Sequence, residues 1–111
     1  MSRVLVVGDT HAPVMHPTYV QFLADVRDEW SCDTVVHIGD LVDWASISYH
    51  PKAPSLKNSE LEYRKAYEQV QMLYAELGPD VTWFVGNHDA LTERHAQDCG
   101  LPLSVLKSYA D

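Results

Sequence analysis

Three short runs of apolar and β-branched residues, each ending at a glycine, constrain the fold of this chain more than any other feature. They are Val4–Val7 before Gly8, Thr34–Ile38 before Gly39, and Val81–Val85 before Gly86. Runs of this length and composition, bounded by glycine, are typical of buried strands. The first run has no polar residue, which predicts a strand buried on both faces of a parallel sheet.

Amphipathic stretches separate the three runs. We expect one helix to begin at the capping box Thr18-x-x-Gln21, after Pro13 and Pro17, and a longer one to begin at the capping box Ser59-x-x-Glu62 and end at Gly78-Pro79. Both carry apolar residues at helical spacing: Tyr19, Phe22, Leu23, Val26 and Trp30 in the first, and Tyr63, Ala66, Tyr67, Val70, Leu73, Tyr74 and Leu77 in the second.

Two weaker helical patterns follow the third run, at about 90–98 and at 103–109. No internal repeat or linker divides the 111 residues, so we expect a single domain over 1–111. The order strand-helix-strand-helix-strand predicts an α/β fold, in which a parallel sheet is layered with helices through right-handed crossovers.

Polar side chains follow each predicted strand at the point where the strand ends. The three motifs are Gly8-Asp9-Thr10-His11, Gly39-Asp40-Leu41-Val42-Asp43 and Gly86-Asn87-His88-Asp89. Open parallel sheets bind ligands beyond the carboxyl ends of their strands, so these motifs are expected to meet at one edge. Three such motifs, each at the carboxyl end of its predicted strand, are much stronger evidence for a ligand site than one.

The residue types in these motifs suit divalent metal ions. Imidazole, carboxylate and amide oxygen are ligands for Mn, Fe, Zn or Ni. Two such ions about 3.5–4 Å apart can hold the attacking and leaving oxygens of a displacement at phosphorus, and can activate a water near neutral pH. The motifs therefore predict a two-metal site that hydrolyses phosphomonoesters or phosphodiesters.

The motifs D-x-H, G-D-x-x-D and G-N-H-[D/E] resemble those of the calcineurin-like metallophosphoesterases, in the same order. The resemblance covers about residues 3–95 and implies metal ligation by Asp9, His11, Asp40 and Asn87, with Asp40 bridging two ions. It implies a catalytic role for His88 at the phosphate. Asp89 would orient His88 by accepting the proton of its other ring nitrogen.

Further residues are candidates for supporting the site or contacting substrate. Asp43 is expected to support a ligand or cap a helix, and Trp44 and His50 lie in the long, proline-containing loop at 40–58. That loop, with Arg94, looks similar to a phage- and bacteria-associated branch of the family.

The remaining histidines and aromatic residues have simpler interpretations. We expect His37 to pack in the core, together with Trp83 and Phe84, and His16 and His95 to lie at the surface. His95 is the one histidine downstream of the third motif, which makes it the candidate to replace the missing downstream histidines as a metal ligand.

The chain departs from the family pattern in one respect. Family members continue with a further histidine and a later G-H-x-H motif, which complete the metal shells, and no G-H-x-H occurs here. Relative to that pattern the domain is incomplete. A truncated product, completion of the site by oligomerisation, and a vestigial site are all consistent with the sequence. The alternative function is therefore a metal-binding, oligomerising half-domain with little or no turnover.

Composition and charge limit the classes of partner that we expect for this protein. The net charge of −8 and the lack of clustered Lys and Arg disfavour duplex DNA, although a nuclease role stays open. No apolar run is long enough to span a membrane. Cys32 and Cys99 form neither a disulfide framework nor a metal-type pair, so we expect a reduced, cytoplasmic protein. An unfinished parallel sheet also has open edges, which predicts self-association into a homo-oligomer.

Overall fold

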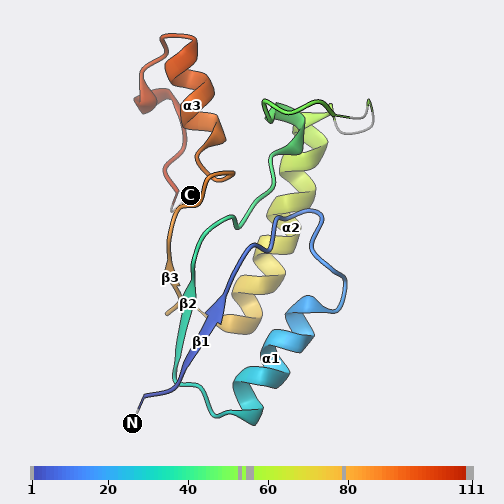
Figure 1. The fold of residues 1–111 in the computed structure, drawn as a ribbon, viewed down its shortest axis with the longest axis vertical. Coiled ribbons are helices and arrows are strands. Elements are labelled where there is room, and N and C mark those ends of the chain that lie inside the picture. The colour runs from blue at the N-terminus through green and yellow to red at the C-terminus, as the bar shows by residue number, and fades with distance from the viewer. Residues whose placement is uncertain (1, 53, 55–56, 79, 110–111) are drawn as a thin grey trace.

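The computed structural model describes residues 2–52, 54, 57–78 and 80–109, and it has the predicted α/β architecture (Figure 1). Three parallel strands lie in the order β1-β2-β3, which is also their order in the sequence. The elements in chain order are β1 (Val4–Val7), α1 (Tyr19–Glu29), β2 (Thr34–His37), η1 (Ala45–Ile47), α2 (Ser59–Leu77), β3 (Thr82–Trp83), α3 (Leu91–Asp98) and η3 (Leu103–Val105).

Helices α1 and α2 pack against the same side of the sheet, as Figure 1 shows. The register pairs Val4 with Thr34 and Val7 with His37, and His37 with Trp83. Alternate residues of β1 and β2 therefore point toward the two helices. The core formed there contains Leu5, Val7, Leu23, Val35, Leu73, Leu77 and Val81.

The opposite face of the sheet is apolar but exposed, which corrects the expectation that β1 is buried on both faces. Val6 is 58% exposed, Ile38 55% and Phe84 58%. The expectation failed because α1 and α2 both pack against the other face, so a continuous apolar run here does not mean two covered faces. Phe84 is accordingly not a core residue, whereas Trp83 packs against the core.

Both predicted capping boxes are wrong in their details. The Thr18 side chain makes no capping bond, because its hydroxyl pairs with His16 Nδ1 at 2.9 Å. Helix α2 is capped by Asn58, whose side chain accepts the Leu61 N–H at 3.0 Å. Glu62 is thereby free to bind a distant loop instead of the start of its own helix.

Helix α3 (Leu91–Asp98) confirms the helix expected at about 90–98, but the strand before it and the helix expected after it are shorter than predicted. Strand β3 is reduced to Thr82–Trp83, although Phe84 N–H still donates to the His37 carbonyl at 2.9 Å. The expected helix at 103–109 is a single 3-10 turn, η3. No helix in the described part of the chain is long and apolar enough to cross a membrane.

Candidate metal centre

The loops that follow β1 and β2 continue side by side beyond the sheet. His11 N–H donates to the Asp40 carbonyl at 3.0 Å, and Ala12 N–H donates to the Leu41 carbonyl at 2.9 Å. Asp43 N–H returns a bond to the Ala12 carbonyl at 2.9 Å. These bonds extend the parallel pairing past the strand ends, so the first two motifs are held against one another by backbone contacts.

Left-handed backbone conformations concentrate in these loops. Asp9, His11, Asp40 and Trp44 have φ values of 49°, 48°, 54° and 51°. Such conformations cost roughly 1 kcal/mol or more at residues other than glycine, and they persist where the surrounding structure imposes them. Here the paired loops impose them.

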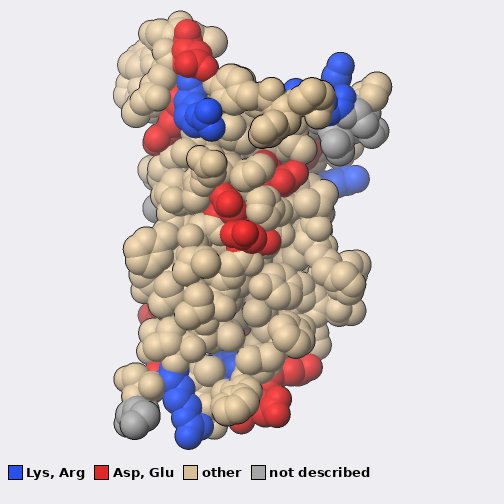
Figure 2. Space-filling model, in the orientation of Figure 1, with Lys and Arg blue, Asp and Glu red and all other residues tan. Residues whose placement is uncertain are grey.

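Asp9, His11 and Asp40 form a cluster that fits one divalent ion. One ligand atom from each residue lies within 4.8 Å of those of the other two. Ligand atoms that share an ion at about 2.1 Å are at most about 4.2 Å apart, so only a sub-ångström adjustment is needed. Two carboxylates and an imidazole are also a suitable donor set. Acidic side chains gather just beyond the upper ends of β1 and β2 in Figure 2.

Asp43 sets the orientation of His11. The His11 Nδ1 atom lies 2.9 Å from Asp43 Oδ1, and a carboxylate can only accept there, so Nδ1 carries the proton. The lone pair of His11 is then on Nε2, which lies 3.9 Å from Asp40 Oδ2. A carboxylate that fixes the tautomer in this way is the usual support of a metal-binding histidine.

The third motif is attached to the other two through His88. Its backbone N–H donates to Asp40 Oδ1 at 2.9 Å, and its ring Nδ1 lies 2.7 Å from the Asp43 carbonyl oxygen. A carbonyl can only accept, so Nδ1 is protonated and Nε2 is free. The rings of His88 and His11 meet edge to face with centroids 4.7 Å apart. His11, Asp43 and His88 also form a second group with metal-ligating spacing.

Asp89 has different partners from the one that the family resemblance suggested. Its carboxylate accepts the N–H groups of Gly86 at 2.9 Å, Val42 at 3.0 Å and Leu41 at 3.3 Å. The proton on His88 Nδ1 goes to the Asp43 carbonyl instead. The buried Asp89 carboxylate therefore links the second and third motifs by accepting hydrogen bonds from backbone N–H groups of both.

Two glycines allow the ends of β2 and β3 to approach closely. A Cβ on Gly86 would lie 2.2 Å from the backbone nitrogen of Asp40, and a Cβ on Gly39 would lie 2.8 Å from Gly86 Cα. Any side chain at Gly86 would displace Asp40 from the metal cluster.

A chain of hydrogen bonds lies beneath the cluster. His37 is fully buried, as expected for a core histidine, and its Nδ1 accepts the Gly39 N–H at 3.1 Å. Its Nε2 therefore donates to Thr10 Oγ1 at 3.1 Å, and Thr10 donates to the Leu41 carbonyl at 2.9 Å. Burial lowers the pKa of His37 below its ordinary value of 6.5, against the opposing effect of Asp89, Asp9 and Asp40.

The long loop beside the cluster is fixed at two points. The Glu62 carboxylate of α2 accepts the N–H groups of Ala45 at 2.8 Å and Ser46 at 2.9 Å. Further along, Tyr49 stacks on His95 with centroids 4.5 Å apart, and its hydroxyl donates to Asp98. The loop therefore bridges α2 and α3 over the site.

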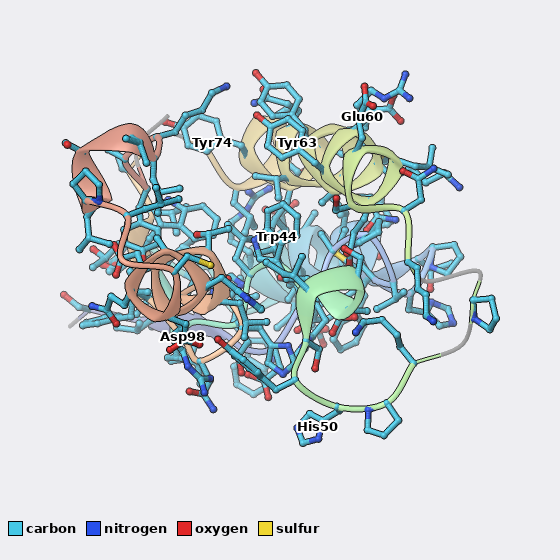
Figure 3. All side chains as sticks on the ribbon, turned by 90° about the horizontal axis from the view of Figure 1, so that it is seen from above. Trp44, His50, Glu60, Tyr63, Tyr74 and Asp98 are labelled. Atoms are coloured by element: carbon cyan, nitrogen blue, oxygen red, sulfur yellow. The ribbon has the colours of Figure 1, made fainter. Side chains whose placement is uncertain are left out.

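His95 and Trp44 belong to this loop packing. His95 Nε2 bonds to the Ile47 carbonyl, so His95 is a packing residue of α3 and not the surface residue that was expected. Trp44 stacks on Tyr63 of α2, with centroids 6.3 Å apart, and Figure 3 shows it between α2 and α3. His50 lies at the outer edge of the loop in the same view.

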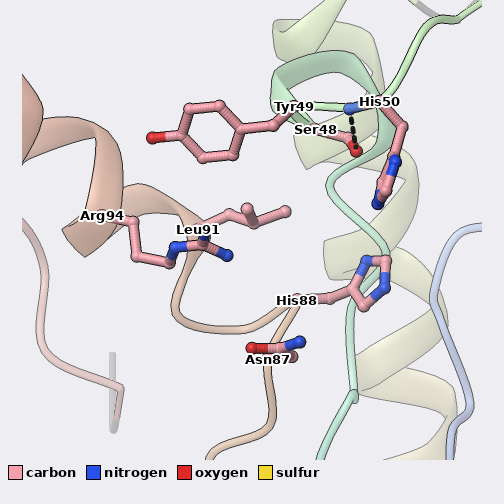
Figure 4. A pocket seen from close by; sticks show the side chains of 7 residues that line it. All are labelled: Ser48, Tyr49, His50, Asn87, His88, Leu91 and Arg94. Carbon is pink, nitrogen blue, oxygen red and sulfur yellow. Dashed lines mark hydrogen bonds between the residues drawn. The ribbon is translucent and has the colours of Figure 1, made fainter.

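A pocket of about 220 Å³ opens between the loop and α3. Asn87 and His88 form its floor, and Arg94 and His50 stand on opposite sides (Figure 4). Its full lining is Ser48, Tyr49, His50, Asn87, His88, Leu91 and Arg94. Four of the expected site residues, Asn87, His88, His50 and Arg94, thus line one cavity beside the cluster of Asp9, His11 and Asp40.

The chain belongs to the calcineurin-like phosphoesterase family, because the family model matches residues 2–110. No curated protein and no solved structure matched the chain. The family resemblance stated from the three motifs is therefore confirmed, and the structure adds a cluster of Asp and His side chains that could hold a metal ion.

Several supporting residues could not be found from the sequence. Thr10 was visible only as the variable position of D-x-H, and Glu62 was assigned to a capping box. Tyr49 carried no signal, because its partners His95 and Asp98 lie more than 40 positions away in the chain. Such pairings depend on how the loop and helices meet in space.

Proposed function

We propose that this protein is a metal-dependent phosphoesterase that hydrolyses phosphomonoester or phosphodiester bonds at the strand ends. The observation that carries the proposal is the cluster of Asp9, His11 and Asp40, whose ligand atoms lie within 4.8 Å of one another in a member of a phosphoesterase family. When bound, divalent ions there would lower the pKa of a water molecule and polarise the phosphoryl oxygens. Their identity among Mn, Fe, Zn and Ni follows from availability.

Each proposed ligand has a defined position. Asp9, His11 and Asp40 would hold the first ion. Asp40 would be shared with a second ion, which Asn87 would also bind. Support comes from the bond between the His88 N–H and Asp40 Oδ1, which brings the third motif within reach of the second. Asp43 would keep His11 Nε2 unprotonated and available as a ligand.

His88 is the proposed catalytic residue. Because its Nδ1 proton is held by the Asp43 carbonyl, its Nε2 atom is left to face a substrate. A neutral ring would accept a hydrogen bond there, and a protonated ring would donate one to a phosphate oxygen or to the leaving group. Asp89 acts on this residue through the backbone, by holding the turn that begins at Gly86.

A catalytically incomplete metal-binding half-domain is the second candidate. It is favoured by the small number of ligands proposed for the second ion, which are Asp40 and the exposed Asn87. Such a protein would bind one ion at Asp9, His11 and Asp40 and release no phosphate.

Hydrolysis assays separate the two candidates. We expect the purified protein with Mn²⁺ to hydrolyse 4-nitrophenyl phosphate or its bis-ester, and EDTA to abolish the reaction. Asp40→Asn, which keeps an acceptor for the His88 N–H but removes the charge, should lower kcat/KM by more than 100-fold. Asp80→Asn, at an exposed carboxylate, is the matched control. Metal binding without hydrolysis would favour the half-domain, and hydrolysis that survives both EDTA and Asp40→Asn would refute the metal mechanism.

A further inference from the structure

The pocket beside the metal cluster has a different lining from the cluster itself. Asn87 and His88 are common to the proposed site and the pocket, whereas Asp9, His11 and Asp40 do not line it. A phosphate group held at the cluster would therefore leave the pocket to the portion of the substrate attached to it. This inference rests on the proposed function and concerns which substrates that function would select.

Arg94 is the cationic side chain of this pocket. Within the described residues, no carboxylate or carbonyl accepts a hydrogen bond from its guanidinium group, which lies over the Tyr49 ring at 5.0 Å from the ring centroid. Figure 4 shows the guanidinium on the side of the pocket opposite His88. Arg94 is exposed, so its guanidinium is accessible to a ligand that enters the pocket. Its planar donors match the geometry of a carboxylate or phosphate.

Tyr49 holds Arg94 in this position. One face of the Tyr49 ring stacks on His95 with an interplanar angle of 6°, and the Arg94 guanidinium lies over the ring at 5.0 Å. The hydrogen bond to Asp98 raises the pKa of Tyr49 above its ordinary value, so the hydroxyl stays protonated and keeps the ring in place. Arg94 is thus positioned by a ring that is itself fixed to α3, which lowers the entropy lost on binding an anion.

The size and remaining lining of the pocket limit what it can accept. Its volume of about 220 Å³ is below the roughly 300–1,000 Å³ of pockets that enclose drug-sized ligands. Leu91 supplies an apolar wall, while Ser48 and His50 add polar groups. A compact leaving group with an anionic end fits these features better than a large neutral one.

We propose that Arg94 is a specificity-determining residue that binds a second anionic group on the leaving portion of the substrate. The preferred substrates are small phosphate esters that carry a carboxylate or a second phosphate a few bonds from the scissile phosphate. Arg94 would form a paired hydrogen bond to that group, and Tyr49 would act as its positioning residue.

A matched pair of substrates tests this assignment. Phenyl phosphate and 4-carboxyphenyl phosphate differ by one carboxylate, and the ratio of their kcat/KM values reports selection for it. We expect Arg94→Gln to lower that ratio about tenfold relative to the unsubstituted protein, as the loss of a hydrogen-bonded charge predicts. Comparing ratios between protein variants cancels the intrinsic reactivity of the two esters. Arg64→Gln, which removes an exposed cation of α2, should leave the ratio unchanged.

A binding measurement separates failure of this inference from failure of the proposed function. Calorimetric titration with phenylphosphonate and 4-carboxyphenylphosphonate, with and without Mn²⁺, requires no turnover. Tighter binding of the carboxylated compound that is lost in Arg94→Gln supports the anion pocket even if neither ester is hydrolysed. Equal binding of the two phosphonates, or a preference that survives Arg94→Gln, overturns it even if both esters are hydrolysed.

Discussion

At the scale of single residues, hydrogen bonds fix Nδ1 of both site histidines, His11 and His88, and leave Nε2 of each ring available to a ligand. His11 and His88 both place their Nδ1 protons on Asp43, one on its carboxylate and the other on its carbonyl oxygen. Asp43 therefore decides which nitrogen of each ring faces the cluster. From the sequence, Asp43 was expected to support a ligand or cap a helix, but the motif G-D-x-x-D did not identify His11 and His88 as its partners.

Removing the Asp43 carboxylate should weaken metal binding. We expect Asp43→Ala to raise the Kd for Mn²⁺ by about 10–100-fold, because His11 loses the group that fixes its tautomer and orientation. Asp43→Asn should have a smaller effect, since its amide oxygen can still accept from Nδ1. Calorimetric titration of both variants checks this order, with Asp80→Ala as the control. Equal affinities in all of these proteins would contradict the role assigned to Asp43.

The buried His37 should make stability depend on pH. Burial lowers its pKa in the folded protein, so the unfolded chain binds the proton more readily. The stability contributed by neutral His37 is complete above pH 6.5 and is lost as the pH falls from 6.5 through the lower folded pKa. Urea unfolding between pH 5.5 and 7.5 should show this loss, with a slope of up to about 1.4 kcal/mol per pH unit from this group.

The substitution His37→Gln provides the comparison. This variant should be less stable at neutral pH, because Thr10 and Gly39 lose their partner, but its stability should fall less between pH 6.5 and 5.5. Where the variant is too unstable to measure, titration of the ring ¹⁵N shifts of His37 in the unsubstituted protein should show a pKa below the ordinary value of 6.5. A pKa at or above 6.5 would contradict the effect assigned to burial.

At the scale of elements, the strand ends and the loops after them position the site. The strands were predictable because each is a short apolar run that ends at glycine, and the motifs follow directly. The long loop at 40–58 was predicted too, but its contacts were not, since Glu62 reaches Ala45 and Ser46 from another element and Tyr49 reaches α3. The partner of Asp89 was misassigned for a similar reason. Local pattern identifies which residues lie at a strand end, but tertiary packing selects their hydrogen-bond partners.

Close approach of β2 and β3 makes Gly86 the most sensitive backbone position. A Cβ there would overlap the Asp40 backbone nitrogen at 2.2 Å, so Gly86→Ala should lower the free energy of unfolding by about 3 kcal/mol. It should also displace Asp40 and weaken metal binding. Gly78→Ala is the matched control, because Gly78 has a φ of 87° but open space around its Cα, and about 1 kcal/mol of strain is expected. Urea denaturation of the two variants measures the difference, and equal losses would refute the overlap.

At the scale of the whole molecule, one layer of helices covers one face of the sheet. The other face presents Val6, Ile38 and Phe84 to solvent, and such apolar patches commonly mediate association. The α/β class and the strand and helix order followed from the sequence. The exposed face did not, because an apolar residue in a strand has the same appearance whether or not another layer covers it.

We expect this face to promote self-association. Sedimentation velocity at increasing protein concentration should show a shift from monomer to dimer or larger species. The double substitution Val6→Lys and Ile38→Lys should suppress the shift, because it places two charges on the face without changing the helix-packed core. Val14→Lys, at an exposed apolar residue outside the sheet, is the control. A protein that stays monomeric at all concentrations, or a double variant that associates like the control, would contradict this expectation.

The central claim is that the three strand-end motifs form a divalent metal centre, and direct metal titration tests it most simply. Metal-free protein should be titrated with Mn²⁺ by calorimetry, alongside Asp40→Asn and the control Asp80→Asn. We predict saturable binding of at least one ion per chain, unchanged in Asp80→Asn and at least tenfold weaker in Asp40→Asn. No saturable binding, or binding that Asp40→Asn leaves intact, would contradict the claim.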